Sequence, residues 1–392
     1  MKNFKNYNDY SKKEELTFES KVVHGALGHD PMTGAVSFPI FQSATFRHIA
    51  LGEDTGFSYS RVKNPTRQEL ERTMAILEEG LEGFAVSSGM AAVTCVLSML
   101  NPGEHVILSD DLYGGTLHIN ETFFSRYGIE FTQVDMTDIN NLKNAIRKNT
   151  KMIFIETPTN PMMKVADIEE ISKIAKSIGA VTVVDNTFLT PYFQKPLTLG
   201  ADIVIHSGTK YLGGHNDTLA GIIVVKKQEH ADFMFEQVKT FGNQIAPLDA
   251  WLILRGLKTL AVRMRQHNEN AMKVANWLRE QPKVKEVYFV GFEDHPQYNI
   301  TKKQTTGFGG MISFAVDSDE TAKQILEKVD LIMFAESLGG TETLITYPLT
   351  QTHNSVPEEI REKLGITGRL LRLSVGIEDA NDIIKDLENA MK

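Results

Sequence analysis

The chain is poor in cysteine, in long apolar runs and in any strong excess of positive charge. Its single cysteine, Cys95, excludes an intramolecular disulfide and a metal site built from several cysteines. No run of about 18 apolar residues could cross a membrane, and the polar segment 1–15 lacks the apolar core of a signal peptide. Lysines and arginines are scattered among acids, and the net charge is −9, which argues against a surface for nucleic acids or anionic membranes. We therefore expect a cytoplasmic protein that binds no nucleic acid, membrane or metal ion.

From about residue 65 the sequence alternates between short apolar runs and amphipathic segments. The apolar runs are continuous and rich in β-branched residues, the pattern of strands covered on both faces of an α/β sheet. Strands are expected at 83–86, 105–108, 152–155, 181–184 and 202–205, and helices at 67–79, 88–100, 138–148 and 167–178. One long helix is expected at 249–279, followed by strands at 287–289, 311–314 and 371–374.

These elements predict an α/β protein with three parts. A turn-rich arm spans residues 1–60 and is expected to contact a partner subunit. A large domain with a mostly parallel sheet spans 61–255, and a smaller C-terminal α/β domain spans 256–392.

Polar residues follow three of the predicted strands, at the ends where ligands bind in open α/β sheets. Glu156 to Pro161 follow the strand at 152–155, Asp185 to Thr187 the strand at 181–184, and His206 to Lys210 the strand at 202–205. One such ending is ordinary, because a lone Asp is usually a turn former or helix cap and a lone Lys is usually solvated. Three endings at one edge of a sheet indicate a single polar ligand in a shared crevice.

Each ending supplies a group that a pyridine phosphate cofactor needs. Asp185 can pair with a protonated ring nitrogen and keep the ring an electron sink. Lys210 is a candidate nucleophile, because desolvation after a buried strand activates a lysine amine. The hydroxyls of Ser207 and Thr209, and the free N–H groups of the helix start at 87–92, can bind a phosphate. Tyr113 follows another strand and can stack on an aromatic ring.

Four segments resemble the motifs of a known family. The sequence His-Ser-Gly-Thr-Lys-Tyr-Leu-Gly-Gly-His at 206–215 resembles the Schiff-base lysine motif of the Cys/Met-metabolism pyridoxal-phosphate enzymes, the transsulfuration enzymes. Segments 88–90, 185–187 and 372–376 match in order and spacing, and the similarity runs from about residue 20 to the C-terminus. The resemblance implies the aspartate aminotransferase-like fold (fold type I) of pyridoxal-phosphate-dependent transferases, with pyridoxal 5'-phosphate (PLP) attached to Lys210.

The resemblance also implies a role for each matched residue. The expected cofactor-binding residues are Tyr59, Arg61, Ser88, Gly89, Met90, Tyr113, Asn160, Asp185, Thr187, Ser207, Thr209 and Lys210. The expected substrate-binding residues are Asn160, Glu336, Ser337 and Arg372. Lys210 and Tyr113 are expected to be catalytic, with Lys210 the general base, and the fork of Arg372 is expected to grip the substrate α-carboxylate. Tyr59 and Arg61 resemble residues that reach a neighbouring subunit's cofactor, which implies a homodimer or homotetramer with shared active sites.

Three positions bear on the individual activity. Glu336 matches a position where cystathionine-handling members carry an acid. The alternative interpretation of Glu336 is a surface carboxylate at a strand end. Ser58 stands where cystathionine γ-lyases and γ-synthases often carry an acid, and Gly115 stands where typical methionine γ-lyases carry a cysteine. One sequence leaves open which nucleophile or leaving group the pocket admits.

We therefore expect a carbon–sulfur lyase of transsulfuration, within cysteine and methionine metabolism and amino-acid biosynthesis. The first expectation is the cystathionine γ-lyase or β-lyase type, acting on L-cystathionine or related sulfur amino acids by α,γ- or α,β-elimination. A cystathionine γ-synthase or O-acyl-homoserine sulfhydrylase, running γ-replacement, comes second, and a methionine γ-lyase third. A catalytically silent regulator that binds PLP is a remote alternative.

Overall fold

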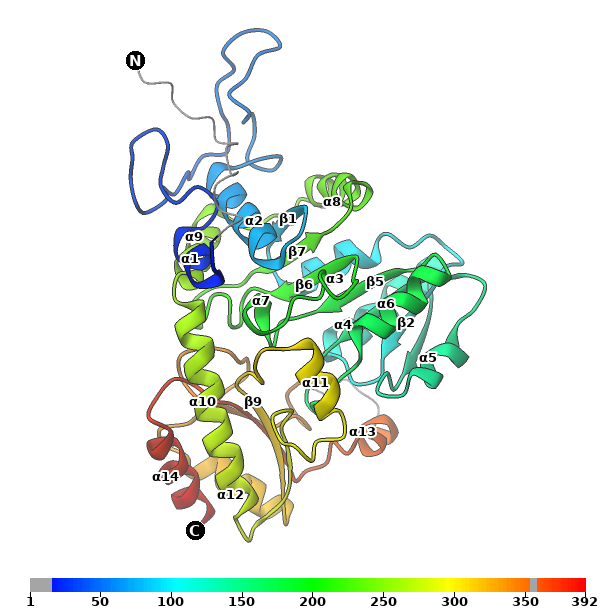
Figure 1. Cartoon of the computed structure of the whole chain (residues 1–392), viewed down its shortest axis with the longest axis vertical. Helices are drawn as coiled ribbons and strands as arrows, with labels where there is room; N and C mark the ends of the chain where they lie inside the picture. The colour runs from blue at the N-terminus through cyan, green and yellow to red at the C-terminus, as the bar shows by residue number, and fades with distance from the viewer. Residues whose placement is uncertain (1–15, 353–357) are drawn as a thin grey trace. The chain divides into compact units, whose positions relative to one another are not determined.

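The computed structural model describes residues 16–352 and 358–392, which divide into two compact units (Figure 1). Unit 1 comprises residues 16–99 and 202–261, and unit 2 comprises residues 100–201, 262–352 and 358–392. Residues 1–15, on which the prediction about a signal peptide and the start of the predicted arm fall, lie outside the described residues. The domain bounds at 60 and 255 stay a prediction.

Unit 1 is built on three antiparallel strands in the order β1-β7-β6. The strands are β1 (Glu82–Val86), β6 (Ile203–Ser207) and β7 (Gly221–Val225). The helices are α1 (Phe18–His24), α2 (Pro65–Glu78), α3 (Gly89–Leu97), α8 (Gln228–Phe241) and α9 (Pro247–Leu257). Every residue of β7 is buried, because this central strand is paired on both edges and covered on both faces.

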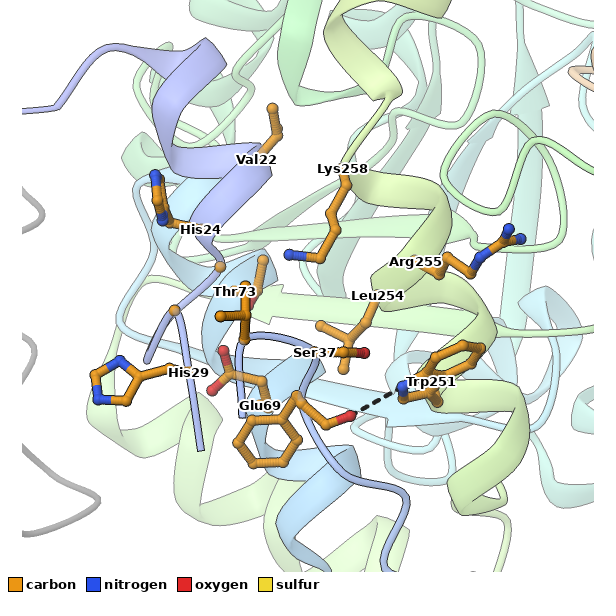
Figure 2. Close-up of a pocket in the computed structure, with 14 residues that line it drawn as sticks. Val22, His24, His29, Ser37, Glu69, Thr73, Trp251, Leu254, Arg255 and Lys258 are labelled. Atoms are coloured by element: carbon orange, nitrogen blue, oxygen red, sulfur yellow. Dashed lines mark hydrogen bonds between the residues drawn. The ribbon is translucent and has the colours of Figure 1, made fainter. Parts of the chain in front are cut away.

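Side chains of α9 and of the residue after it donate hydrogen bonds to the backbone of the described part of the N-terminal arm. The indole Nε1 of Trp251 donates to the carbonyl oxygen of Phe38 at 2.9 Å. Figure 2 labels Trp251 and Lys258 among the residues of this region. Nζ of Lys258 donates to the carbonyl oxygen of Val23 at 2.6 Å. A cavity of about 410 Å³ lies between the arm, α2 and α9, and Glu69 of α2 is one of its lining residues. The arm therefore has an irregular backbone held at defined points by long side chains of a helix.

The first half of unit 2 contains four parallel strands in the order β5-β4-β2-β3. The strands are β2 (His105–Ser109), β3 (Glu130–Val134), β4 (Thr150–Glu156) and β5 (Val181–Asp185). The helices are α4 (Gly114–Thr122), the short 3-10 helix η1 (Phe124–Tyr127), α5 (Ile139–Ala145), α6 (Ile168–Ser177) and α7 (Thr190–Phe193). All of β2 and nearly all of β4 are buried, which agrees with the continuous apolar runs of their sequences.

The second half of unit 2 contains a five-stranded sheet in the order β10-β11-β12-β9-β8. The strands are β8 (Val284–Tyr288), β9 (Met311–Val316), β10 (Met333–Phe334), β11 (Leu344–Thr346) and β12 (Leu370–Ser374). The helices are α10 (Leu260–Arg279), whose first two residues belong to unit 1, α11 (Tyr298–Gln304), α12 (Asp319–Lys328), α13 (Glu358–Leu364) and α14 (Ala380–Met391).

The two faces of this second sheet contact different parts of unit 2. Helices α10, α12 and α14 share one apolar core with β9 and β12 (Figure 1), and that core includes Leu371 and Leu373 of β12. Because successive side chains of a strand point to opposite faces, Arg372 is directed away from this core. Its partner across the β12–β9 ladder is Ser313, whose hydroxyl donates to the carbonyl oxygen of Pro161 at 2.7 Å. The alternation of side chains along β12 thus places Arg372 on the sheet face that contacts the loop after β4.

One sequence prediction about the helices is wrong. The single helix expected at 249–279 is two helices, α9 and α10, separated by Lys258 and Thr259. Both the backbone N–H and the hydroxyl of Thr259 donate to the carbonyl oxygen of Gly256 at 3.1 Å. A side-chain hydroxyl that bonds a nearby carbonyl competes with the helical ladder, and this contact occurs where the ladder stops.

The described residues contain neither a candidate membrane span nor a candidate metal site. No helix in the described ranges is long and apolar enough to cross a membrane. Within residues 16–352 and 358–392, no group of three or more His, Cys, Asp or Glu side chains is placed to hold a metal ion.

Candidate active site

Lys210 lies in a tight turn after β6 in unit 1. Its backbone N–H donates to the carbonyl oxygen of Ser207 at 3.2 Å, and its own carbonyl oxygen accepts the N–H of Gly214 at 2.8 Å. The turn also touches α9, because a Cβ at Gly256 would lie 2.2 Å from the carbonyl oxygen of Gly213. Tyr211, directly after Lys210, is fully buried. Lys210 is therefore carried by a turn whose backbone is bonded on one side and packed against a helix on the other.

The start of α3 packs closely against Ser207. A Cβ at Gly89 would lie 3.0 Å from Cβ of Ser207 and 3.1 Å from its Oγ, so a larger residue would have to push Ser207 away by a few tenths of an ångström. Ser88 is the N-cap of α3, and its side chain accepts the N–H of Ala91 at 3.1 Å. The hydroxyl of Thr209 accepts the N–H of Ala220 at 3.0 Å, which orients it on the turn. The structure thus places Ser207 beside the helix start that includes Gly89.

Tyr59 and Arg61 lie together on the exposed side of unit 1. The guanidinium of Arg61 sits 5.7 Å from the ring centroid of Tyr59, and its Nη1 donates to the carbonyl oxygen of Lys239 at 2.8 Å. The Tyr59 side chain is 44% exposed. An aromatic and a cationic side chain presented outward in this way are available to a partner.

In unit 2, Arg372 is the centre of a buried polar group. Its side chain is only 2% exposed. Nη1 donates to Oδ1 of Asn160 at 2.9 Å, and Nη2 donates to the carbonyl oxygen of Ser337 at 2.8 Å and to Oγ1 of Thr346 at 3.1 Å. The structure therefore brings together three of the four predicted substrate-binding residues.

Ser337 and Glu336 differ in their surroundings. Ser337 has a φ of +89°, outside the region that side chains other than glycine prefer, and it presents its carbonyl oxygen to Arg372. Strained backbone of this kind persists where its surroundings hold it and is common at functional sites. Glu336, one residue earlier, is exposed, so the predicted contact with a substrate ammonium stays a prediction.

Asp185 and Tyr113, also in unit 2, are each oriented by a neighbour. Oδ1 of Asp185 accepts the N–H of Thr187 at 3.0 Å and its hydroxyl at 2.5 Å. The backbone N–H of Tyr113, the residue before α4, donates to Oε2 of Glu156 at 2.9 Å. The Tyr113 side chain itself is 45% exposed, so its ring is free of the core.

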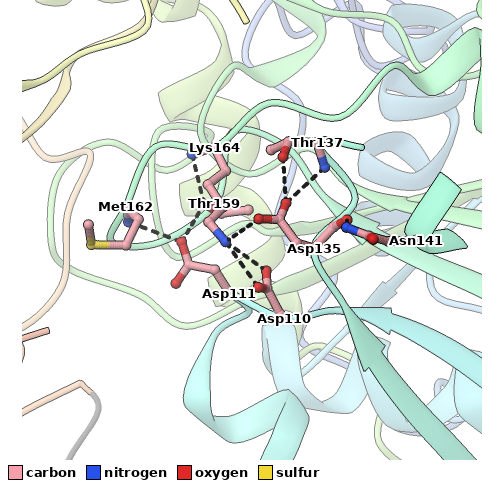
Figure 3. Close-up of polar contacts among 8 residues, drawn as sticks. All are labelled: Asp110, Asp111, Asp135, Thr137, Asn141, Thr159, Met162 and Lys164. Atoms are coloured by element: carbon pink, nitrogen blue, oxygen red, sulfur yellow. Dashed lines mark hydrogen bonds and ion pairs between the residues drawn. The ribbon is translucent and has the colours of Figure 1, made fainter. Parts of the chain in front are cut away.

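The loop that carries Asn160 is held by a polar network, drawn in Figure 3. Nζ of Lys164 pairs with Oδ2 of Asp110 and with Oδ2 of Asp135, both at 3.0 Å. The hydroxyl of Thr159 donates to Oδ2 of Asp111 at 2.5 Å. Burial raises the pKa of Asp111 to about 6, against the hydrogen bond from Thr159, which lowers it. The network joins the loop after β4 to the ends of β2 and β3.

Lys164→Met is expected to weaken this attachment. The substitution removes two ion pairs that are about one quarter exposed on the lysine side and leaves Asp110 and Asp135 facing each other. We expect a loss of about 1–2 kcal/mol in the free energy of unfolding, measured by chemical denaturation. Because Asn160 contacts Arg372, the KM for an amino-acid substrate should also rise.

Lys173→Met is the matched control for that variant. Lys173 pairs with Glu169 one helical turn away on α6, and the lysine side chain is 70% exposed and the glutamate 38%. Surface pairs of this kind contribute little, so the free energy of unfolding should not change measurably. Equal effects of the two variants would show that the Lys164 network does not hold the loop.

Sequence reasoning missed the residues whose role depends on tertiary contact. Glu156 was visible as a polar residue at the end of a strand, but nothing in the pattern connected it to Tyr113. Thr346 lies on β11, next to β12, and only the antiparallel register Thr346↔Arg372 places it beside the guanidinium. The role of Lys164 could have been predicted only if the ends of β2 and β3 had been known.

The residues present fit a pyridine phosphate cofactor on chemical grounds. In unit 1, the helix N-terminus at Gly89 and Met90 can bind an anion. The Ser207 side chain packs against this helix N-terminus. The same unit supplies the amine of Lys210, and unit 2 supplies the oriented carboxylate of Asp185 and the exposed ring of Tyr113. Phosphate, aldehyde, pyridine nitrogen and ring face each have a group of matching chemistry.

Comparisons with known proteins agree with this chemistry. The family model for Cys/Met metabolism PLP-dependent enzymes matches residues 19–392. The cystathionine beta-lyase of Lactococcus lactis subsp. cremoris is 46% identical over 376 residues, which cover 96% of this chain and 99% of that protein. The cystathionine gamma-synthase/O-acetylhomoserine (thiol)-lyase of Bacillus subtilis is 48% identical over 373 residues, 95% of this chain and 96% of that protein.

A solved structure gives the same result for the fold. The crystal structure of cystathionine gamma-lyase from Lactobacillus plantarum, complexed with L-serine, matches with a TM-score of 0.94 and 41% identity. The match covers 96% of this chain and 98% of that chain. The predicted fold class, cofactor and enzymatic nature are confirmed. The chain belongs to the family of PLP-dependent enzymes of Cys/Met metabolism.

Proposed function

We propose that this enzyme is a carbon–sulfur lyase that acts on L-cystathionine or a related sulfur amino acid by α,γ- or α,β-elimination. The observation that carries the proposal is the buried Arg372, whose guanidinium is fixed by Asn160, Ser337 and Thr346. A planar, pre-oriented guanidinium matches the two oxygens of an α-carboxylate. The lyase names of relatives at about 46% identity support the reaction type.

The residues of unit 1 hold the cofactor in this proposal. The backbone amides of Gly89 and Met90, with the hydroxyls of Ser207 and Thr209, bind the phosphate, and Ser88 caps the helix that presents those amides. Lys210 holds PLP through its ε-amino group. The same ε-amino group, when not bonded to the cofactor, would be the general base for the proton on the substrate α-carbon.

The residues of unit 2 orient the cofactor ring and the substrate. Asp185, oriented by Thr187, pairs with the pyridine nitrogen. PLP, when bound, supplies an electron sink for the substrate α-carbon. The ring of Tyr113 stacks on the cofactor, and its phenol is the candidate to protonate the departing sulfur. Oδ1 of Asn160 accepts from Arg372, which leaves its amide nitrogen as the group that would donate to the phenolic oxygen of the cofactor.

We further propose that two copies of the chain share each active site, in a homodimer or homotetramer in the cytoplasm. In this proposal, Tyr59 and Arg61 bind the phosphate of the neighbouring subunit's cofactor. The outward placement of Tyr59 supports this assignment, as does the exposure of apolar side chains on the arm. Val36 is 79% exposed and Leu51 is completely exposed, and contact with a partner subunit would remove these apolar side chains from water.

A γ-replacement activity is the second candidate. A relative that is 48% identical is named cystathionine gamma-synthase/O-acetylhomoserine (thiol)-lyase, so nearly the same degree of similarity accompanies the replacement reaction. The two reactions differ in whether a thiol nucleophile or water completes the cycle. The exposed Glu336 and the neutral Ser58 are the positions at which the substrate's distal group is expected to be selected.

A product assay tests the proposal. The purified enzyme is supplied separately with cystathionine, methionine, cysteine, homocysteine and O-acetylhomoserine with a thiol, and the keto acids and thiols are measured. Elimination at the γ-carbon of cystathionine gives α-ketobutyrate and cysteine, and elimination at the β-carbon gives pyruvate and homocysteine. If cystathionine yields neither keto acid while O-acetylhomoserine and thiol yield a thioether, the replacement reaction is correct.

A further inference from the structure

Glu156 ends the strand next to the one that carries Asp185. In the parallel β4–β5 ladder the two residues are direct partners, Glu156↔Asp185. Neighbouring strands lie about 4.8 Å apart, and paired residues point to the same face of the sheet. Two carboxyl groups are therefore held side by side at the carboxyl end of the parallel strands.

The two carboxyl groups have different partners. Oδ1 of Asp185 accepts two hydrogen bonds from Thr187, one from its N–H and one from its hydroxyl, and such donors favour an ionised carboxylate. Glu156 is 6% exposed, and its Oε2 accepts the backbone N–H of Tyr113 at 2.9 Å. The backbone N–H of Asn160 also donates to Glu156, but burial and the charge of Asp185 are the larger effects on its pKa and raise it. Among the described residues, no lysine or arginine forms an ion pair with Glu156.

Buried like charges at this distance do not both persist, because each raises the cost of the other. The ionisable groups that act on Glu156 in this unit are Asp185 on β5 and Asp111 after β2, and both are acids. Burial, followed by the charge of Asp185, raises the pKa of Glu156 well above its ordinary value. The proton therefore belongs on Glu156, and the negative charge belongs on Asp185.

We propose that Glu156 is a positioning residue that stays protonated, so that it anchors the Tyr113 turn through one oxygen and leaves Asp185 as the carboxylate presented to the pyridine nitrogen. The proposal deepens the proposed function and rests on it, because it takes Asp185 as the partner of the ring. An ionised Glu156 would compete with Asp185 for the same proton on the ring nitrogen. A neutral Glu156 retains a carbonyl oxygen for the N–H of Tyr113, so the anchor does not require an ionised carboxylate.

Infrared spectroscopy of the full-length holoenzyme tests the protonation state directly. At about pH 8, above the pKa of Asp111 at about 6, the spectrum should contain the carbonyl stretch of a buried carboxylic acid. Glu156→Gln should remove that band, and Asp111→Asn should not. A wild-type minus Glu156→Gln difference spectrum that lacks a carboxylic acid band and shows a carboxylate band instead would overturn the proposal.

Thermal unfolding as a function of pH gives an independent readout. A carboxyl group whose folded pKa lies above its unfolded value stabilises the protein below the unfolded pKa, and this contribution is lost as pH rises through the folded pKa. The Tm of the wild type should therefore fall relative to that of Glu156→Gln as pH rises from about 5 to about 9. A Tm difference that rises with pH, or does not change, would contradict a protonated Glu156.

The anchoring role is tested by a pair of variants of similar size. Glu156→Gln keeps an oxygen that can accept the N–H of Tyr113, and Glu156→Leu does not. We expect Glu156→Leu to bind PLP at least about tenfold more weakly than Glu156→Gln, measured by equilibrium dialysis against free PLP. Equal affinities of the two variants would contradict the anchoring role. The infrared and Tm results do not require Lys210 to hold PLP, so a failure of the proposed function leaves them decisive for Glu156.

Discussion

Replacing Lys210 by alanine is expected to reduce turnover by at least about 10⁴-fold and to leave PLP held only by non-covalent contacts. If the proposed function is correct, the variant loses both the amine that holds the cofactor and the general base. The fold should persist, because the turn is bonded through its backbone, from Lys210 to Ser207 and from Gly214 to Lys210. Borohydride reduction followed by peptide mapping should label the peptide with Lys210 in the wild type and no peptide in the variant.

Lys227→Ala is the control for that experiment. Lys227 follows β7 in the same unit, is about half exposed and pairs with Asp202 at 2.8 Å. Its loss should leave the labelled peptide and the turnover number unchanged. Borohydride labelling of a lysine other than Lys210 in the wild type would overturn the assignment of the cofactor anchor.

The Lys210→Ala variant also tests the sharing of sites between two copies. Mixing it with Arg61→Ala, which is expected to be impaired in binding the neighbour's phosphate, should produce mixed oligomers with one intact site. Activity should reappear after the subunits have exchanged. Persistent inactivity in a mixture with demonstrated exchange would assign Arg61 to its own subunit.

Arg372→Lys is expected to lower kcat/KM by roughly 100-fold, mainly through KM. Lysine preserves the charge but not the planar fork, so one of the two hydrogen bonds to an α-carboxylate is lost. The buried neighbours of Arg372 also lose donors, since Asn160, Ser337 and Thr346 all accept from its guanidinium. Steady-state kinetics with the preferred substrate of the product assay measure the effect.

An amine analogue without the α-carboxylate separates binding from structural damage. If Arg372 binds the carboxylate, the wild type and the variant should bind this analogue equally weakly, as measured by changes in the visible band of the cofactor. Arg369→Lys, on the exposed residue just before β12, should behave as wild type with both ligands. An Arg372→Lys defect of the same size for the analogue and the substrate would mean that Arg372 only supports the fold around it.

The buried parallel strands could be predicted because their sequences carry the signal within five residues. Strands β2, β4 and β5 are continuous apolar runs, and such runs require cover on both faces. Strand β3 was not predicted, because Glu130–Val134 mixes polar and apolar residues and is only partly buried. Strand β7 is as apolar as the others, but it pairs antiparallel to β1 and β6, outside the predicted alternation of strand and helix.

The candidate site was predictable at the residues that belong to motifs and not at those that support them. The contact between Arg372 and Asn160 joins positions 212 residues apart, and it was expected only through the resemblance to a family. Glu156 and Thr346 belong to no such expectation, because their roles arise from the register of neighbouring strands. Local sequence determines which residues a strand end presents, whereas the pairing of strands determines which of those residues meet.

Gly256 limits how this chain can diverge in evolution. Most positions of a helix accept substitution because a new side chain can rotate away from its neighbours, but the contact at Gly256 joins backbone to backbone. Any other residue would displace the carbonyl oxygen of Gly213, three residues beyond Lys210. Descendants of this sequence can exchange much of the exposed side of α9, yet a change at position 256 would move the turn that carries Lys210, the proposed attachment point of the cofactor. The reach of one lysine is thus protected by a residue that has no side chain.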